Sequence, residues 1–147
     1  MPSPDTTPEE KDEWIVVLGG SGSVGRYVAQ IARIAGYKVV ASSSKGKADV
    51  RATPRPAESV RMLTPDQLAI ASGANATFDN RASEAEQLNA IRRITAGRFC
   101  RVVDASAQAA ELAVKALVTL GTGEEKYFAT VDDWFVSSTQ REMREVY

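Results

Sequence analysis

The residues best suited to do chemistry form a glycine-rich hexapeptide near the start of the chain, Gly20-Ser21-Gly22-Ser23-Val24-Gly25. An apolar run, Trp14–Leu18, precedes it and is long enough for one buried strand, and Arg26–Ala35 follows with apolar residues at helical spacing. A G-x-G-x-x-G pattern between a strand and a helix is typical of dinucleotide-binding turns, because the helix amino terminus presents unpaired N–H groups and a partial positive charge to phosphate. A glycine-rich turn that binds no ligand is the alternative.

Each glycine of the motif has its own expected part. Gly20 permits the tight turn off the strand, Gly22 lets a pyrophosphate approach the backbone, and Gly25 lets the helix pack against its strand. The stretch does not fit a P-loop, since Gly25 is followed by Arg26 and Tyr27 where a lysine and a hydroxyl residue would be needed.

A second set of candidate ligands follows the next predicted strand, Tyr37–Ala41. It comprises Ser42, Ser43, Ser44 and Lys45. An NAD-binding domain usually has Asp or Glu near this point to hold the ribose 2′-hydroxyl, and none is present here. Three hydroxyls and a lysine suit a 2′-phosphate instead, so the sequence favours NADP(H) over NAD(H). A solvated polar loop is the alternative.

The rest of the chain alternates between predicted helices and strands. Two helices open with capping boxes, Thr64 with Gln67 and Ser83 with Glu86. Alternation of this kind predicts a Rossmann-type three-layer α/β domain, with a parallel sheet of about five strands in the order 3-2-1-4-5. The expected helices are Pro65–Ser72, one starting at Ser83, Ser106–Leu120, and one in the tail at Ser138–Val146; the expected later strands are Ala76–Asp79, Phe99–Ala105 and Lys126–Val131.

In that strand order a dinucleotide lies across the carboxyl ends of the strands, where the order reverses. Asp104, Ala105 and Ser106 end the fourth strand beside this crevice. Asp104 is therefore expected either to bind the cofactor or to cap the next helix. We divide the chain into a disordered leader (1–13), a dinucleotide-binding domain (14–134) with an irregular insert (46–63), and a tail (135–147).

Composition narrows the class of protein. The chain has 147 residues, 44% hydrophobic and 25% charged, with a net charge of −1, which indicates a globular domain without attraction to nucleic acid or anionic membranes. It has no histidine, and Cys100 is its single cysteine, so we expect neither a disulfide nor a metal centre, and a buried inert thiol. The polar start does not resemble a signal peptide, which favours a cytoplasmic location. The sequence is also compatible with a homodimer.

Several spaced segments together resemble the cofactor-binding half of the medium-chain dehydrogenases/reductases, and within them the zinc-independent quinone oxidoreductases and enoyl reductases. These segments are VVLGGSGSVGRYVAQIARIAGYKVVASSS, GANATFDNR, FCRVVDAS and KYFATV. The resemblance implies hydride transfer from NADP(H) to an enone, quinone or other carbonyl-type acceptor. It places Ser21–Val24 at the pyrophosphate, Ser42–Lys45 at the adenosine phosphate, and Asn80 beside the cofactor where the family has an aromatic residue or histidine.

Two departures from that family affect the expected activity. The family has an amino-terminal catalytic domain and a sixth strand, whereas here only residues 1–13 precede the first predicted strand. We therefore expect a fragment whose sheet is incomplete at its C-terminal edge. It should bind cofactor without turnover, with no catalytic residue of its own and a small-molecule substrate only in the presence of the missing domain. A non-enzymatic nucleotide-binding or redox-sensing module and a non-functional truncated product are the alternatives.

The stretch from Gly46 to about Gln67 has no counterpart in the resemblance. A genuine surface insertion and a translated intron both explain it.

Overall fold

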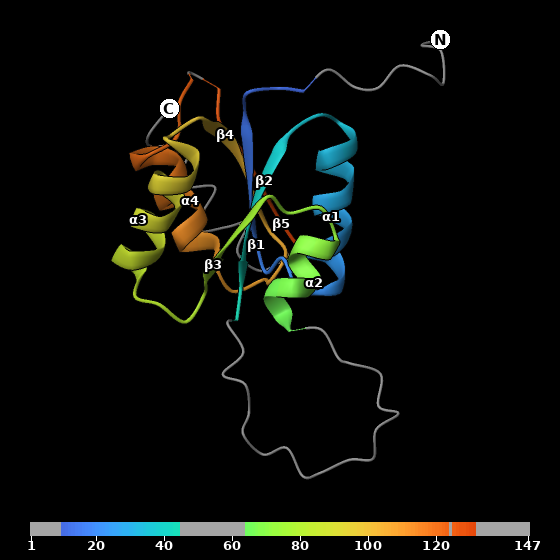
Figure 1. Cartoon of the computed structure of the whole chain (residues 1–147). Helices are drawn as coiled ribbons and strands as arrows, with labels where there is room; N and C mark the ends of the chain where they lie inside the picture. The colour runs from blue at the N-terminus through green and yellow to red at the C-terminus, as the bar shows by residue number, and fades with distance from the viewer. Residues whose placement is uncertain (1–9, 45–63, 124, 132–147) are drawn as a thin grey trace, which may run out of the picture.

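The computed structural model describes residues 10–44, 64–123 and 125–131. They form an α/β domain around one parallel sheet of five strands in the order β3-β2-β1-β4-β5, as predicted (Figure 1). The strands are β1 Trp14–Leu18, β2 Lys38–Ser43, β3 Ala76–Asp79, β4 Phe99–Asp104 and β5 Tyr127–Thr130. The helices are α1 Ser23–Ile34, α2 Pro65–Ala71, α3 Glu84–Thr95 and α4 Ala110–Thr119.

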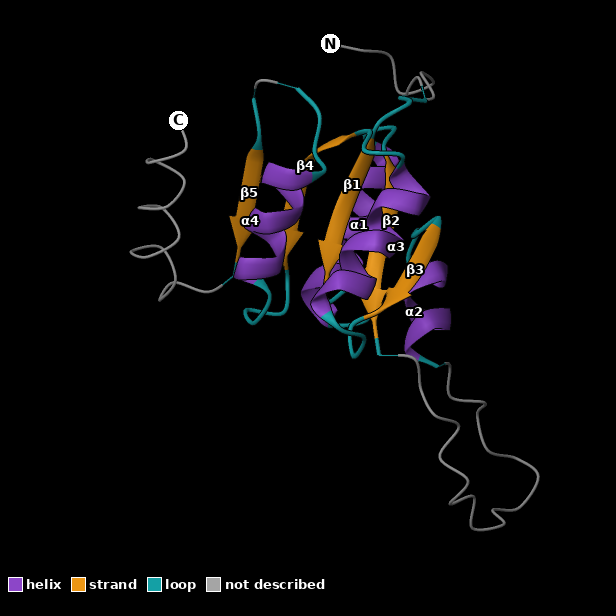
Figure 2. Cartoon of the chain, turned by 90° about the vertical axis from the view of Figure 1, so that its left-hand side faces the viewer, coloured by secondary structure: helices purple, strands orange, loops and turns teal. Residues whose placement is uncertain are grey.

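Two helices cover each face of the sheet, which makes three layers. α1 and α2 lie on one side, here called the α1 face, and α3 and α4 lie on the other, the α3 face (Figures 1 and 2). Side chains alternate along β1, so that Val16 and Leu18 point to the α3 face while Ile15 and Val17 point to the α1 face. Because both faces of the strand are covered, it is apolar throughout.

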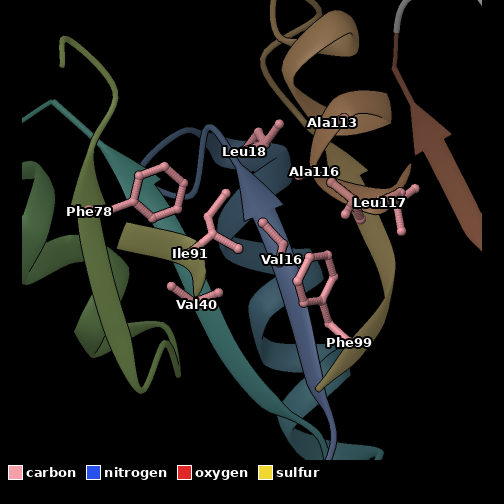
Figure 3. Close-up of a cluster of buried hydrophobic side chains, with 10 residues drawn as sticks. Val16, Leu18, Val40, Phe78, Ile91, Phe99, Ala113, Ala116 and Leu117 are labelled. Atoms are coloured by element: carbon pink, nitrogen blue, oxygen red, sulfur yellow. The ribbon is translucent and has the colours of Figure 1, made fainter. Parts of the chain in front are cut away.

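The larger hydrophobic core lies on the α3 face (Figure 3). Phe78, Ile91 and Phe99 fill it, and α4 contributes Ala113 and Leu117. The core on the α1 face is built mainly from small residues, which lets α1 and α2 approach the sheet closely; they are Ala29, Ala32, Ala41, Ala69 and Ala74.

The parallel register brings the carboxyl ends of the strands to one edge. Leu18 of β1 is opposite Asp104 of β4, and Ser43 of β2 is opposite Asp79 of β3. The predicted site residues that follow these strands therefore share this edge.

Several predicted boundaries are wrong by one residue, and three are wrong by more. α1 begins at Ser23 rather than Arg26, because Gly22 has extended backbone and ends the turn as the helix cap. β2 continues through Ser43 instead of ending at Ala41. α4 begins at Ala110 rather than Ser106, since Ala107 takes a left-handed conformation (φ 59°) that interrupts helical geometry.

Both predicted capping boxes are confirmed. The Thr64 side chain accepts a hydrogen bond from the Gln67 backbone, and the Ser83 side chain accepts one from Glu86. In each box the glutamine or glutamate side chain bonds back to the cap residue.

Part of the predicted leader contacts the domain. Asp12 forms ion pairs with Lys38 (2.9 Å) and Arg98, and Glu13 pairs with Arg101 (2.6 Å). The predicted insert (46–63) and tail (135–147), including its expected helix, lie outside the described residues. None of the helices in the described ranges is long and apolar enough to cross a membrane.

Candidate functional site

The glycine turn is fastened to the end of β2 by one serine. The Gly19 N–H donates to Ser42 Oγ (2.8 Å), and the Gly20 N–H donates to the Ser42 carbonyl (2.8 Å). The residue that makes the tight turn is Gly19, with φ +80°, and not Gly20 as predicted. Gly20 is glycine for another reason, because a Cβ there would overlap the side chain of Ala41.

The other two glycines of the motif face different surroundings. A Cβ on Gly25 would overlap the Gly19 carbonyl, so Gly25 allows α1 to start against the turn. At Gly22 the nearest neighbour of a Cβ would be the Gly19 carbonyl at 3.5 Å, and the φ of −75° is open to any residue. Nothing in the described chain therefore requires glycine at position 22.

The amino terminus of α1 is open to an anion. Gly22 caps the helix without a side-chain hydrogen bond, and the first turn holds no acidic residue. Ser23 and Val24 are exposed there. Unpaired N–H groups and the helix dipole favour a negative charge at this position.

The serine run differs from the predicted phosphate-binding loop. Ser42 and Ser43 are buried strand residues, 3% and 0% exposed. Ser42 holds the glycine turn, and Ser43 Oγ donates to the carboxylate of Asp66 in α2. Ser44 is half-buried, and Lys45 lies outside the described residues.

Asp104 organises the loop between β4 and α4. Its carboxylate is fully buried and accepts hydrogen bonds from the Ser106 N–H (3.0 Å), the Ser106 hydroxyl (2.7 Å) and the Ala109 N–H (3.2 Å). Thr130 Oγ1 adds a fourth contact at 3.4 Å. Of the two roles open to Asp104, these bonds favour the structural one. The neighbouring Ala105 N–H donates to the Leu18 carbonyl (2.8 Å), which ties the loop to β1.

A cavity of about 340 Å³ lies on the α3 side of the carboxyl edge. Four residues from the sequence-predicted region border it: Gly19, Ser42, Asn80 and Ser106. The remaining lining residues come mainly from the first turns of α3 and α4 and the loop before α4: Leu18, Glu84, Gln87, Gln108, Ala109, Glu111 and Leu112. Within the described ranges, the lining includes two carboxylates and three carboxamides but neither lysine nor arginine.

The sequence analysis did not identify the residues that α3 and α4 contribute to this cavity. Helices that follow β3 and β4 must begin at the carboxyl edge, so Glu84, Gln87 and Glu111 could have been placed there by topology. These three residues do not belong to any sequence motif that would have marked them as a site. Among the described residues, no group of three His, Cys, Asp or Glu side chains is placed to hold a metal ion.

Comparisons with known proteins place this geometry in context. No protein-family model matches the chain. A zinc-type alcohol dehydrogenase-like protein of Schizosaccharomyces pombe is 53% identical over 34 residues, which are 23% of this chain and 10% of that protein. A mycobacterial protein solved in complex with NADPH aligns over 88% of this chain and 36% of its own, with a TM-score of 0.55 at 16% identity.

Two further solved structures show the same fold. An enoyl thioester reductase from Candida tropicalis, in a mutant form, aligns over 94% of this chain and 41% of its own (TM-score 0.51, 11% identity). A thermostable alcohol dehydrogenase from Pyrobaculum aerophilum aligns over 92% and 34% (TM-score 0.50, 22% identity). These solved structures share the Rossmann-like α/β fold of this chain over part of their own length.

The shared fold covers only part of each similar protein. The chain spans 34–41% of these three structures and a tenth of the curated relative. At 11–22% identity the structural matches show the shared fold and nothing about the substrate.

Proposed function

We propose that this chain is the nicotinamide-dinucleotide-binding domain of an oxidoreductase. The observation that carries the proposal is Gly22, which no contact and no backbone angle within the described chain requires to be glycine. A ligand that lies against the backbone there does require it, since a Cβ would occupy the approach path. The first turn of α1 has neither a side-chain cap nor an acidic residue, which suits a pyrophosphate as that ligand.

The other candidate residues fit two parts of a dinucleotide, its pyrophosphate and one nucleoside. Ser21, Gly22, Ser23 and Val24 would hold the pyrophosphate with backbone N–H groups. The cavity beside Ser42 and Asn80 is polar, concave and large enough for part of a nucleoside. Asp104 and Ala105 would shape its far wall through the loop they organise. Gly20 and Gly25 support the turn rather than touch the ligand.

Hydride transfer is the chemistry that the nicotinamide supplies when bound. We propose an enone, quinone or other carbonyl-type acceptor from the sequence resemblance alone; an enoyl thioester reductase and an alcohol dehydrogenase share the fold. We propose zinc-independent chemistry from the same resemblance; the 147 residues themselves, with no histidine and one cysteine, do not supply the three Cys or His ligands typical of a catalytic zinc. Because the chain spans about a third of such proteins, we expect it to bind cofactor without turnover.

The choice between NADP(H) and NAD(H) now depends on fewer residues. The serine run predicts NADP(H), and a mycobacterial protein of similar fold was solved with NADPH. Two of the three serine hydroxyls are already used inside the domain, however, which leaves Ser44 and Lys45 for a 2′-phosphate.

Titration with NADH and NADPH, followed by nicotinamide fluorescence, tests the proposal. We expect Gly22→Ala to weaken binding at least tenfold while the free energy of unfolding changes by less than about 1 kcal/mol. Ile34→Ala is the matched control, since it alters the exposed far end of the same helix and should leave binding unchanged. A folded wild-type chain that binds neither nucleotide would overturn the proposed function.

A further inference from the structure

A carboxylate from a later part of the chain lies at the end of β2. Ser43 is the last residue of β2, and its hydroxyl donates to Asp66, which lies in the first turn of α2. No acidic residue is near Ser43 along the chain, so the predicted site lacked one. The fold supplies it from a later element.

The position of Asp66 is set by the helix that carries it. The Thr64 capping box fixes the first turn of α2 through two bonds, Gln67 N–H to Thr64 Oγ1 (3.3 Å) and Thr64 N–H to Gln67 Oε1 (3.0 Å). Asp66 is inside that turn and is half-buried, so its carboxylate is held at the strand end while part of it meets solvent.

Asp66 also stands next to the candidate cofactor site. Ser43 follows Ser42, which binds both Gly19 and Gly20 of the glycine turn, and the Ser43 carbonyl accepts the Asn80 N–H (3.1 Å). The end of the second strand is where dinucleotide-binding sheets place the adenosine ribose, and a carboxylate there accepts hydrogen bonds from the ribose hydroxyls. A 2′-phosphate at the same point would meet a like charge.

We propose that Asp66 is the specificity-determining residue of this site and that it selects NAD(H) over NADP(H). The inference rests on the proposed function and reverses the preference predicted from the serine run. Asp66 accepts a hydrogen bond from the 2′-hydroxyl while Ser43 holds its other side. The serines act as the support of the carboxylate and of the glycine turn, and not as a phosphate site.

The charge of the neighbouring cavity supports the same preference. Glu84 and Glu111 line it, and no lysine or arginine does among the residues that the structure describes. Glu84 is paired with Lys115, and Arg81, on the loop after Asn80, is exposed and does not line the cavity. A dianionic phosphate placed there would meet hydroxyl and carboxamide donors but no cation among the described lining residues, whereas hydroxyls and an adenine amino group would find carboxylate acceptors.

A purely structural role for Asp66 makes a different prediction. If the carboxylate only steadied Ser43, its removal would change stability and would affect both cofactors equally. The ratio of the two dissociation constants therefore separates the two roles.

The test is to titrate the wild-type chain, Asp66→Asn and two control variants with NADH and with NADPH. We expect the wild type to bind NADH at least tenfold more tightly, and Asp66→Asn, which keeps an acceptor for Ser43, to shift the ratio about tenfold toward NADPH. Asp12→Asn removes a carboxylate at the opposite edge of the sheet and should leave the ratio unchanged. Asp79→Asn removes the carboxylate on the register partner of Ser43, which bonds the Arg81 N–H (2.9 Å), and should move the ratio less than Asp66→Asn does.

The outcomes are distinguishable. Tighter binding of NADPH by the wild type, or a ratio that follows Asp79 and not Asp66, overturns this inference while the proposed function stands. Binding of neither cofactor by a folded wild-type chain overturns the proposed function. If Asp66→Asn does not fold, 5′-AMP and 2′,5′-ADP are compared on the wild type, and tighter 2′,5′-ADP binding overturns the inference.

Discussion

At the scale of single residues, the glycines of one motif have different surroundings. A Cβ on Gly25 would overlap the Gly19 carbonyl, whereas a Cβ on Gly22 would be in ordinary contact with the same carbonyl at 3.5 Å. We expect Gly25→Ala to lower the free energy of unfolding by about 1–3 kcal/mol, because the added methyl group forces the turn away from α1. Urea denaturation of both alanine variants measures the difference, and equal losses for Gly22→Ala and Gly25→Ala would contradict this account.

Cys100 is a thiol whose ionisation is suppressed. Burial is the main reason that the pKa of Cys100 is raised, and the hydrogen bond from its Sγ to the Glu13 carboxylate (2.9 Å) adds to the shift, while the charge of Arg101 opposes it. A raised pKa means less thiolate at neutral pH, so alkylation by iodoacetamide should be slow in the native state.

Removal of the Glu13 carboxylate tests this cause. Glu13→Gln should lower the pKa of Cys100 and speed alkylation several-fold at pH 8, because the neighbouring negative charge is lost. Asp12→Asn is the control, since Asp12 pairs with Lys38 and Arg98. An unchanged rate in Glu13→Gln would assign the suppressed reactivity to burial alone.

Residue types along the chain predicted the glycine turn but not the carboxylate beside it. The motif is local, so its place between a strand and a helix could be inferred from spacing. Asp66 reaches Ser43 only through the packing of α2 on the sheet, and no pattern in the sequence records that contact. The same holds for Ser42, whose hydroxyl is used by Gly19 across the turn.

At the scale of elements, the start of α3 is tied to the charge of one side chain. The backbone N–H of Ser83 is the main cause that lowers the pKa of Glu86, and the Ser83 hydroxyl adds to it. A lowered folded-state pKa stabilises the fold fully above the ordinary value of 4.5, and this stabilisation is lost as the pH falls through the folded-state value.

Glu86→Gln should therefore flatten the acid limb of the stability curve. Glutamine keeps an acceptor for the Ser83 N–H but does not titrate in this range. We expect the melting temperature of the variant to fall less than that of the wild type below about pH 4.5, and to match it more closely at pH 4 than at pH 7. Glu111→Gln, in the first turn of α4, is the control because α4 has no side-chain cap. Parallel curves for wild type and Glu86→Gln would refute the assignment.

Helix starts were predictable where a capping box marks them, and α2 and α3 both begin as expected. The start of α4 was not predicted correctly. Asp104 holds the loop from Ala105 to Ala109 by accepting backbone hydrogen bonds, and in the sequence an aspartate at this place resembles a helix cap. The end of β2 was also missed. Serine is a weak strand former, yet Ser42 and Ser43 are stable there because their hydroxyls find partners within the fold.

At the scale of the whole molecule, the strand order could be predicted because alternating strands and helices leave few right-handed arrangements. The two faces of the sheet are unequally covered. On the α1 face, β1 and β2 lie under α1, while Tyr127 of β5 remains exposed on the same side. This asymmetry follows from the way the helices pack on the sheet.

The exposed flank of α1 provides a test of how much of this surface is covered in solution. Arg26 and Arg33 bond to Ser72 (3.0 Å) and Asn75 (3.3 Å), so this side of the helix faces α2 and β3. Away from it, Ile31 and Ile34 are 65% and 72% exposed.

We expect Ile31→Lys to change the free energy of unfolding by less than about 0.5 kcal/mol, because an exposed side chain on this flank loses no contact within the domain. Ala29→Lys, on the buried side of the same helix, should prevent stable folding, since a charge would enter the core of the α1 face. Urea denaturation measures the first variant, and circular dichroism the second. A loss above about 1 kcal/mol for Ile31→Lys would mean that another part of the chain or a second copy covers this flank, and sedimentation at two protein concentrations would then tell these apart, because only a second copy is lost on dilution.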